Sequence, residues 1–331
     1  MSAVHPAPAR EVTVLAAGGT IAMASGGGPV SPSLDGDALV AAVPALAELS
    51  GLEVSSVDTR PSVHFSGADA LAIARAAVTE AERGRGVVVT HGTDTLEEVA
   101  FLCDLVYGGD APVVFTGAMR PASAPGADGP ANLLDAVWLA WSEAATGLGV
   151  LVAFAGEVHA ARAVRKADST ALRAFASPRL GPVGRVDEGR VTLFARPPRR
   201  PPLSVTAMDA PVDVVTAGLG SQGRTVRVAV DGGAAGLVAV LLGAGHTSPA
   251  HLAALVEAAE RVPVVATVRP EHGAILHATY GFPGSERDLR AGPLVCAGAL
   301  SAAAARIKLM ACLGAGLGRD GIAEAFAPDD A

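Results

Sequence analysis

The sequence has few cysteines and no uninterrupted hydrophobic run. Its three cysteines, Cys103, Cys296 and Cys312, form neither a CxxC pair nor a disulfide-like pattern, which predicts a reducing compartment. The segment MSAVHPAPAREVTV at residues 1–14 lacks the apolar core of a signal peptide. Every apolar stretch is broken by Gly, Pro or charge before it reaches membrane-spanning length. We therefore expect a cytoplasmic protein with no membrane partner.

Lysine is also rare, because only Lys166 and Lys308 of the 25 basic residues are lysines. The net charge of −8 argues against a nucleic-acid partner. A lysine amine can act as a base or proton relay, whereas an arginine cannot lose its proton. Lys166 in VRKADST is therefore a candidate for chemistry, and we expect Lys308 in ARIKLMACL to be a snorkelling helix residue.

Several catalytic and binding motifs are missing from the sequence. It contains no GxGxxG and no GxxxxGK[ST], which disfavours a nucleotide site. It contains no GxSxG elbow and no HExxH, and its eight histidines show no ligand spacing supported by nearby carboxylates. We expect neither a metal nor a cofactor.

The pattern of apolar residues predicts an α/β protein with two domains. Half of the 331 residues are hydrophobic, which is enough for a large core. Predicted strands alternate with helices in the first part, which indicates a mostly parallel sheet covered on both faces. The strands are expected at 11–17, 86–90, 112–116 and 149–155, and the helices at 36–49, 67–83, 95–107 and 130–145.

A second α/β run follows the proline- and arginine-rich segment ARPPRRPPL at 195–203, which can form neither a helix nor a central strand. We expect a larger N-terminal domain with a mostly parallel sheet flanked by helices, a linker and a smaller C-terminal α/β domain, at 1–196, 197–222 and 223–331. The smaller domain is predicted to contain strands at 226–230, 236–242 and 263–268, a helix from about 248 and a helix at 301–313.

The stretch VVVTHGTDTLEEV at residues 87–99 reads as a buried strand that ends in polar residues and continues into a helix. Thr95 and Glu98 have the spacing of a capping box, so the helix should start near Thr95. Capping alone does not account for Thr93 and Asp94, which follow a strand at the sheet edge where ligands bind. A hydroxyl beside a deprotonatable amine can serve as a nucleophile, and Thr93 with Lys166, ordered by Asp94, is such a set.

The first predicted strand ends in a second polar turn. Gly18 and Gly19 permit a tight turn before Thr20. The glycine-rich stretch 23–33 is typical of an active-site lid or of an ordinary surface loop. Asn132, the only asparagine, follows Pro130 near a helix start and is expected to have a structural turn or capping role.

These segments together resemble the bacterial L-asparaginase family over roughly residues 11–325. The matching segments are AAGGTIAM (16–23), THGTDTLEEVAF (90–101), GAMRP (117–121), ADGPANL (127–133), the Lys166 segment and LGPVG (180–184). The resemblance implies hydrolysis of L-asparagine to L-aspartate and ammonia through a threonine acyl-enzyme, without metal or cofactor. It also implies a homotetramer, a dimer of dimers, with active sites between the N-terminal domain of one subunit and the C-terminal domain of its neighbour.

The resemblance also implies a role for individual residues. Thr20 matches the primary nucleophile, and Thr93 and Lys166 match the second hydroxyl and its amine. Asp94 matches the carboxylate that holds the substrate ammonium, and Ser62 in PSVHFS matches the serine that binds the α-carboxylate, as an amino-acid substrate requires. The further residues expected to contact substrate are Gly19, Ala118 and, as the intersubunit glutamate, Glu286. Backbone amides around Thr93 and Gly117–Ala118 would stabilise the oxyanion.

Two departures from the family pattern affect this hypothesis. The family usually has a lid tyrosine, whose place here falls near Gly28, and the chain has only Tyr107 and Tyr280. Either the lid is rearranged, or Lys166 and Thr93 activate the nucleophile, or activity is reduced. Where many relatives have Gly-Asn, this chain has GAGHTS, so His246 is expected either to contact substrate from the partner subunit, with pH-dependent activity, or to have a structural loop role.

Two other functions stay open at this point. A non-catalytic amino-acid-binding homologue would have kept the pocket and lost turnover. An asparaginase-like subunit of a tRNA-dependent amidotransferase would carry an extra N-terminal domain, whereas the first strand here is expected near residue 11. A minor glutaminase activity is also open, because discrimination of one methylene is worth only about 1–3 kcal/mol.

Overall fold

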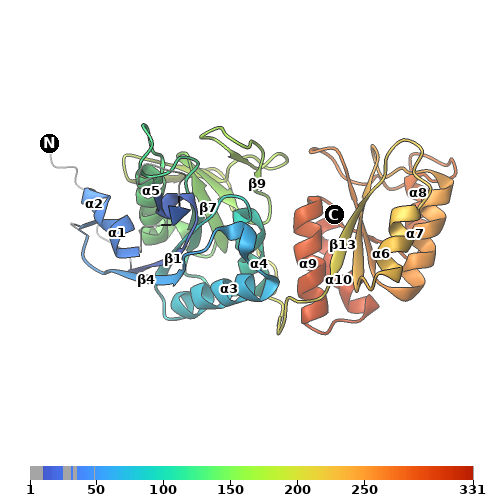
Figure 1. Ribbon diagram of the computed structural model, residues 1–331, viewed down its shortest axis with the longest axis horizontal. Helices are drawn as coiled ribbons and strands as arrows, with labels where there is room; N and C mark the ends of the chain where they lie inside the picture. The colour runs from blue at the N-terminus through green and yellow to red at the C-terminus, as the bar shows by residue number, and fades with distance from the viewer. Residues whose placement is uncertain (1–9, 25–30, 33–35, 48, 331) are drawn as a thin grey trace. The chain divides into compact units, whose positions relative to one another are not determined.

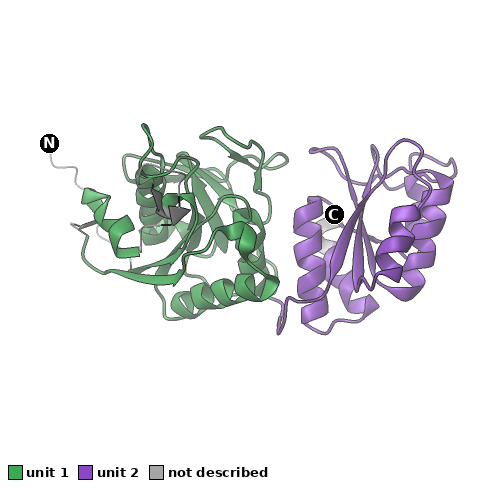
Figure 2. Cartoon of the chain, viewed as in Figure 1, with its two compact units in different colours: residues 1–202 green, residues 203–331 purple. Residues whose placement is uncertain are grey.

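The computed structural model of the protein describes residues 10–24, 31–32, 36–47 and 49–330, which form two compact units. Unit 1 comprises residues 1–202 and unit 2 comprises residues 203–331 (Figure 2). Each unit is built around its own sheet, and the sheet of unit 1 is the larger. The expected α/β class with a larger first and a smaller second part is confirmed.

The sheet of unit 1 has eight strands. Their spatial order is β12 (Arg190–Leu193), β11 (Gly184–Asp187), β8 (Glu157–Ala160), β7 (Val150–Phe154), β6 (Val113–Thr116), β5 (Gly86–His91), β1 (Val12–Ala17) and β4 (Leu52–Asp58). The five strands from β7 to β4 run parallel, and β8, β11 and β12 extend the β7 edge by antiparallel pairing. Every residue of β5 is buried, as expected for a central parallel strand.

Helices cover both faces of this sheet (Figure 1). On one face, α5 (Gly129–Trp141), α1 (Gly36–Ala41) and α2 (Pro44–Ala47) share a core with Val14, Val88 and Val114. On the other face, α3 (Gly67–Glu82) and α4 (Leu96–Val106) pack against each other and against the strands. Three short 3-10 helices complete the unit, namely η1 (Thr20–Ala22), η2 (Ser62–His64) and η3 (Glu143–Ala145).

Two short antiparallel pairs of strands lie outside the large sheet of unit 1. One joins β2 (Met23–Ala24) to β3 (Ser31–Pro32), so the two ends of the expected lid pair with each other. The other joins β9 (Arg165–Lys166) to β10 (Phe175–Ala176) and carries Lys166. Lys166 therefore lies on a hairpin rather than on a strand of the large sheet.

Unit 2 is a four-stranded parallel sheet between two layers of helices (Figure 1). The strands are β13 (Val212–Thr216), β14 (Gly236–Leu241), β15 (Val264–Val268) and β16 (Val295–Cys296), in that spatial order. One face is covered by α6 (Arg224–Asp231), α7 (Pro249–Arg261) and α8 (Glu286–Ala291), and the other by α9 (Ala302–Gly314) and α10 (Arg319–Asp330).

Several predicted elements differ from the structure. The strand expected at 226–230 is wrong, because VRVAV forms part of helix α6. Its two outer valines, Val226 and Val230, are four residues apart and buried, whereas Val228 is exposed, and this spacing fits one helix face as well as one strand face. The helix expected at 36–49 is split, since Pro44 begins a new helix, and the helix expected at 130–145 ends at Trp141.

Two more expectations can be compared with the structure, namely the position of the linker and the environment of Lys308. The boundary falls after Pro202, inside the range 197–222 that was expected as a linker, but the same range contains β13, in which only Val212 and Val215 are buried. Lys308 does not snorkel to solvent as expected. Its side chain is buried, and its Nζ lies 4.8 Å from the centre of the Phe326 ring, a cation–π contact.

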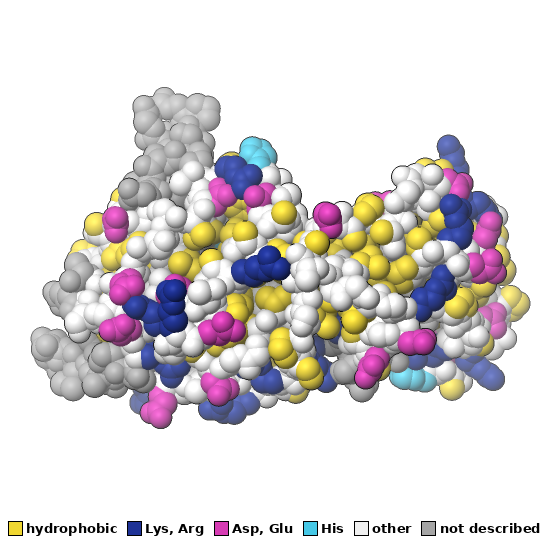
Figure 3. Space-filling model, turned by 90° about the horizontal axis from the view of Figure 1, so that it is seen from below, with side chains coloured by type: hydrophobic (Ala, Val, Ile, Leu, Met, Phe, Trp, Pro, Cys, Tyr) yellow, Lys and Arg dark blue, Asp and Glu magenta, His cyan; other side chains and the backbone are white. Residues whose placement is uncertain are grey.

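The charged residues form no single-sign region on the face shown in Figure 3. Acidic and basic side chains are interspersed there, although the chain as a whole carries a net charge of −8. Among the helices of the described ranges, none is long and apolar enough to cross a membrane.

Candidate active site

The loops after β1, β5 and β6 come together at the carboxyl edge of the parallel sheet. Ala17 at the end of β1 pairs with His91 at the end of β5, and Thr90 pairs with Thr116 at the end of β6. Three candidate residues follow within three positions of these strand ends: Thr20, Thr93 and Ala118. The structure thus brings them to the edge where open α/β sheets bind ligands.

Glycines allow these loops to approach one another closely. Gly18 and Gly19 have φ values of +71° and +88°, as the predicted tight turn requires. A Cβ atom on Gly19 would lie 2.4 Å from the Cα of Gly92, and one on Gly92 would lie 2.5 Å from the Oγ of Ser62. The turn before Thr20 therefore touches the backbone before Thr93, which in turn touches Ser62.

Thr93, Asp94 and Lys166 form one hydrogen-bonded cluster. The Nζ of Lys166 lies 2.9 Å from the Oγ1 of Thr93 and 2.7 Å from the Oδ1 of Asp94. Thr93 is buried, while 60% of the Asp94 side chain and 19% of the Lys166 side chain remain exposed. A hydroxyl, an amine and a carboxylate in this order can activate an oxygen nucleophile or relay its proton.

The start of α4 contributes two further contacts. The expected capping box is wrong, because the Thr95 hydroxyl caps no helix amide and instead donates to the carbonyl oxygen of Ser62 at 3.2 Å. Glu97 accepts a hydrogen bond from the backbone N–H of Lys166. Burial raises the pKa of Glu97, although this hydrogen bond opposes the shift. Sequence reasoning missed Glu97, since an acidic residue in a first helical turn is already explained by the helix dipole.

Ser62 is held beside this cluster by an ion-pair network. Ser62 is buried at the start of η2, two residues after Arg60. The Arg60 guanidinium lies 2.6 Å from the Asp58 carboxylate and 2.7 Å from that of Asp69, and its hydrogen bonds lower the pKa of both acids. Asp69 also forms the capping box of α3 with Ser66, so the segment that carries Ser62 is fixed at both ends.

Asn132 and Asp128 order the loop that contains Ala118. The Nδ2 of Asn132 donates to the carbonyl oxygen of Gly117 at 2.9 Å and to the Asp128 carboxylate at 3.1 Å. The same carboxylate accepts the backbone N–H of Met119 at 3.0 Å. Asn132 is buried in α5, so the structural role expected for it holds, but it connects loops rather than capping its own helix.

Burial makes His91 a weak base. Its side chain is completely buried, and desolvation lowers its pKa to about 4. The ring is neutral, its Nδ1 N–H donates to the carbonyl oxygen of Gly92 at 2.9 Å, and it lies edge-on to Phe65 at 5.4 Å. His91 therefore supports the backbone before Thr93.

His246 and Glu286 form a separate polar pair in unit 2. Their Nε2 and Oε2 atoms lie 3.2 Å apart, and Glu286 also accepts the backbone N–H of Tyr280 at 2.6 Å. Burial acts to raise the pKa of Glu286, but backbone donors and His246 outweigh it and lower the pKa. The His246 ring lies edge-on to Tyr280 at 4.8 Å and to Phe282 at 5.1 Å, and both of those rings are partly exposed.

This pair also lies at the carboxyl edge of a parallel sheet. His246 is in the loop after β14, and Tyr280 and Glu286 follow β15. The structure thus joins two residues that the sequence analysis expected separately at the substrate. It places them within unit 2, and Thr20, Thr93, Lys166, Asp94 and Ser62 within unit 1.

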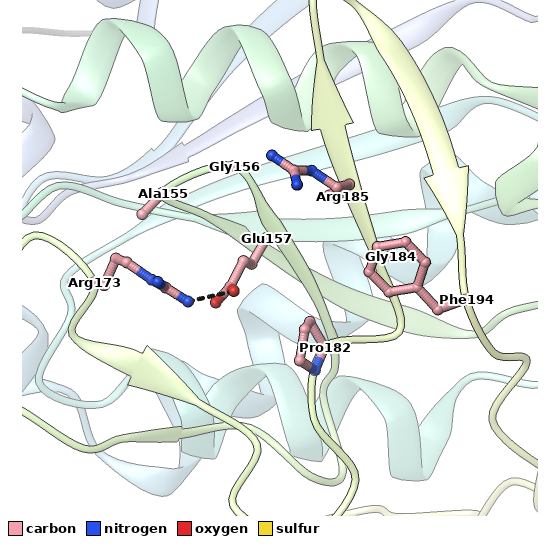
Figure 4. Close-up of a pocket in the computed structure, with 8 residues that line it drawn as sticks. All are labelled: Ala155, Gly156, Glu157, Arg173, Pro182, Gly184, Arg185 and Phe194. Atoms are coloured by element: carbon pink, nitrogen blue, oxygen red, sulfur yellow. Dashed lines mark hydrogen bonds and ion pairs between the residues drawn. The ribbon is translucent and has the colours of Figure 1, made fainter.

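A cavity of about 230 Å³ lies beside the hairpin that carries Lys166, not at the Thr93 cluster itself. Figure 4 shows Glu157 and Arg173 side by side in its lining, joined by an ion pair. Arg173 belongs to the loop between β9 and β10, and Phe175 of β10 packs on Phe154 of β7 with ring centres 4.7 Å apart. These contacts anchor the loop end of the hairpin to the sheet.

The remaining expectations concern the lid and metals. Gly28, the place of the missing tyrosine, lies outside the described residues. Within the residues that the structure does describe, no group of three or more His, Cys, Asp or Glu side chains could hold a metal ion.

Comparison with known proteins follows the same division of the chain. Residues 11–199 match the family model "Asparaginase, N-terminal", and residues 211–326 match "Glutaminase/Asparaginase C-terminal domain". The chain belongs to the asparaginase family. Both the recognition of the family and its division into an N- and a C-terminal part were therefore accessible from the sequence.

Individual relatives cover different shares of the chain. A "Probable L-asparaginase" from Deinococcus radiodurans is 37% identical, with 97% of this chain and 98% of that protein covered. A "Glutaminase-asparaginase" from Pseudomonas fluorescens biotype A is 36% identical, with 62% of this chain and 57% of that protein covered. Among solved structures, a "Probable Cytoplasmic L-asparaginase" from Campylobacter jejuni superposes with a TM-score of 0.82 at 28% identity, covering 96% of this chain and 99% of its own.

Proposed function

We propose that this asparaginase-family chain hydrolyses L-asparagine to L-aspartate and ammonia through a threonine acyl-enzyme. The observation that carries the proposal is the placement of the Lys166 amine 2.9 Å from the Thr93 hydroxyl and 2.7 Å from the Asp94 carboxylate. The relatives named asparaginase, similar over most of their length, support the same reaction.

In the proposed first step, the Thr20 oxygen attacks the carbon of the substrate's side-chain amide. The C–N bond breaks, the threonine proton passes to the leaving nitrogen, ammonia departs, and an aspartyl ester on Thr20 remains. In the second step, water attacks the ester carbon and the proton returns to the Thr20 oxygen. Splitting the reaction into two steps of this kind lowers the barrier of each.

Thr93 and Lys166 would move the proton in both steps. Lys166 donates to the Thr93 hydroxyl when its amine is charged, and it can accept a proton through Thr93 only when neutral. Asp94 keeps the amine in place from the other side. This arrangement offers an activation route that does not need the family's lid tyrosine.

The same edge of the sheet provides the contacts for an amino-acid substrate. We assign the substrate ammonium to Asp94, whose carboxylate is largely exposed, and the α-carboxylate to Ser62. Backbone N–H groups of Gly19, Thr93 and Ala118 would surround the reacting amide and its oxyanion. These groups belong to three neighbouring loops of unit 1.

We further propose a cytoplasmic homotetramer, a dimer of dimers, in which His246 and Glu286 of one copy contact substrate bound to another copy. Their position at the carboxyl edge of the second sheet supports a ligand-facing role. The relative named glutaminase-asparaginase supports a minor activity on L-glutamine as well.

The test is ammonia release from L-asparagine and L-glutamine by the wild type and by Thr20→Ala, Thr93→Ala and Lys166→Arg. Lys308→Arg is the matched control, because it changes the other lysine in the same way at a buried site in unit 2. Acid-quenched protein would then be digested, and mass spectrometry would locate an aspartyl ester on the peptide with Thr20 or on the peptide with Thr93.

Turnover that is lost in the three unit 1 variants and kept in Lys308→Arg is the expected result, with the ester on Thr20. An ester on Thr93 would reverse the two hydroxyl roles. Asparagine binding without ammonia release by the wild type would instead support the amino-acid-binding homologue. Turnover only with an added partner protein would favour the amidotransferase subunit.

A further inference from the structure

The regular backbone hydrogen bonds around Lys166 lie within its own hairpin, where Ala167 and Asp168 also donate to the carbonyl oxygen of Ala174. Strand β9 contains only Arg165 and Lys166, and it pairs only with the equally short β10. The loop that follows is exposed from Asp168 to Arg173. A two-residue strand at the base of an exposed loop does not by itself fix a lysine side chain to within the distance that proton transfer requires.

A carboxylate from α4 ties the backbone of Lys166 to that helix. Glu97 lies in the first turn of α4 and accepts the backbone N–H of Lys166, 69 residues later in the chain. Thr93 and Asp94, just before the same helix, hold the Nζ of that lysine. Lys166 therefore has contacts at both its backbone and its amine with residues 93–97, at and just before the start of α4.

We propose that Glu97 is a positioning residue, which holds the Lys166 backbone so that its amine stays on the Thr93 hydroxyl. The inference rests on the proposed function for its catalytic consequence, and the contact itself is independent of that function. Glu97 bonds the lysine through the backbone, so we do not expect it to touch substrate.

The charge of Glu97 makes this contact sensitive to pH. The charged groups that face it are Glu98 on its own helix and Arg165 and Lys166 on β9. Burial raises the pKa of Glu97 above the ordinary glutamate value, so on acidification it becomes neutral sooner than a free glutamate would. Loss of the charge weakens the hydrogen bond to Lys166, because bonds to ionised acceptors are the stronger ones.

The first test compares the kinetics of Glu97→Ala, Glu97→Gln and Glu98→Gln. Glu97→Ala is expected to lower kcat by about 10- to 100-fold with KM changed less than about twofold, as for a displaced catalytic group. Glu97→Gln keeps an acceptor oxygen and should recover most of kcat at neutral pH, while the acid side of its kcat profile flattens. Glu98→Gln removes a carboxylate charge at the next residue of the helix and should leave kcat within about twofold of the wild-type value.

The second test measures Lys166 directly and does not require turnover. Acetic anhydride at limiting concentration labels free amines, and the chain has only two lysines, so peptide mass spectrometry reports Lys166 and Lys308 separately. Glu97→Ala should raise the labelling rate of Lys166 several-fold, with Lys308 unchanged as the internal reference. Glu98→Gln should change neither rate.

The two tests separate failure of the inference from failure of the proposed function. Unchanged labelling of Lys166 in Glu97→Ala, or an equal increase in Glu98→Gln, would overturn the positioning role. A large change in KM with constant kcat would also overturn it, since it would place Glu97 at the substrate. Faster labelling in Glu97→Ala beside a wild type that releases no ammonia would keep the positioning contact and reject the amidohydrolase.

Discussion

The Oδ1 atom of Asn132 accepts a hydrogen bond from the backbone N–H of Ala155, and the two atoms lie 2.9 Å apart. Ala155 opens the two-residue turn between β7 and β8 with φ of +50°. Because the same asparagine donates to the carbonyl oxygen of Gly117, one buried amide connects the loop after β6 to the turn after β7. The loop that contains Ala118 is thereby tied to the turn that follows the neighbouring strand β7.

Asn132→Ala is expected to destabilise unit 1 by about 2–4 kcal/mol, because the partly buried N–H of Ala155 and the buried carbonyl oxygen of Gly117 both lose their partner. Asn132→Asp keeps the acceptor for Ala155 but replaces the donor to Gly117 with an oxygen beside the Asp128 carboxylate, so its loss should be at least as large when measured by urea unfolding. If Asn132→Ala unfolds at the same urea concentration as the wild type, the amide does not connect the two loops energetically.

Ala155→Gly is expected to stabilise the protein by up to about 1 kcal/mol. The left-handed conformation costs a residue with a Cβ roughly 1–2 kcal/mol, and the greater freedom of glycine in the unfolded chain offsets part of the gain. Glu188→Gly, at φ of +51° in the corresponding turn between β11 and β12, should behave similarly in the same urea measurement. A loss of stability in both variants would show that these turns are not strained.

The sequence predicted those parts of the molecule that short segments determine alone. The valine runs of β5 and β14, the glycine turn before Thr20 and the set of Thr93, Asp94 and Lys166 follow from local pattern or residue chemistry, and the structure contains each segment or contact. The helix at 226–230 did not follow, since valines at every second position fit two periods and only packing chooses between them.

Contacts between segments that are distant in the sequence were the hardest to predict. Glu97 looked like an ordinary first-turn acid, and its partner is 69 residues away. Thr95 had the spacing of a cap, but its hydroxyl bonds to Ser62, 33 residues earlier. Such pairs depend on how the loops meet at the sheet edge, which no periodicity in the sequence encodes.

Gly19→Ala is expected to abolish turnover and to reduce stability more than Gly84→Ala. Both glycines have similar positive φ values, +88° and +83°, so both variants bear the same backbone cost of about 1–2 kcal/mol. A Cβ at Gly84 meets nothing within 4 Å, whereas one at Gly19 would meet the Gly92 backbone at 2.4 Å. Equal loss of activity and of unfolding free energy in the two variants would rule out the close approach of the loops.

The buried histidines predict a loss of stability in mild acid. Desolvation lowers the pKa of His91 and of His159 to about 4, below the ordinary value of 6.5. The unfolded chain therefore binds protons between pH 6.5 and pH 4 that the folded chain does not, so stability is complete above pH 6.5 and falls as the pH approaches 4. The loss is at most roughly 3 kcal/mol for each histidine.

Urea unfolding at pH 7, 5.5 and 4.5 tests this, with His91→Asn and His159→Asn as variants. Each variant should show a shallower decrease in unfolding free energy between pH 7 and pH 4.5, whatever its stability at pH 7. His277→Asn, at an exposed position, is the control and should keep the wild-type slope. Asp58 and Asp69 have lowered pKa values, so their contribution is lost only below about pH 4 and leaves this window nearly unaffected.

Variants of the His246–Glu286 pair test whether unit 2 takes part in substrate binding. Glu286 has no exposed surface and lies against the Nε2 atom of the imidazole, while the exposed rings of Tyr280 and Phe282 flank the ring. If His246 contacts substrate, His246→Ala should raise KM for L-asparagine about tenfold, the value of one hydrogen bond to a charged group, with kcat changed only a few-fold. Glu286→Gln should raise KM less, because its amide oxygen can still accept the Tyr280 N–H.

His277→Ala is the matched control, since it changes an exposed histidine of the loop before Glu286 and should leave KM unchanged. A structural role for His246 predicts a different pattern. Unfolding of the protein by urea would then shift to lower concentration in His246→Ala while KM stayed at the wild-type value. A KM increase in His246→Ala at unchanged stability, together with a smaller increase in Glu286→Gln, would assign the substrate contact to the imidazole.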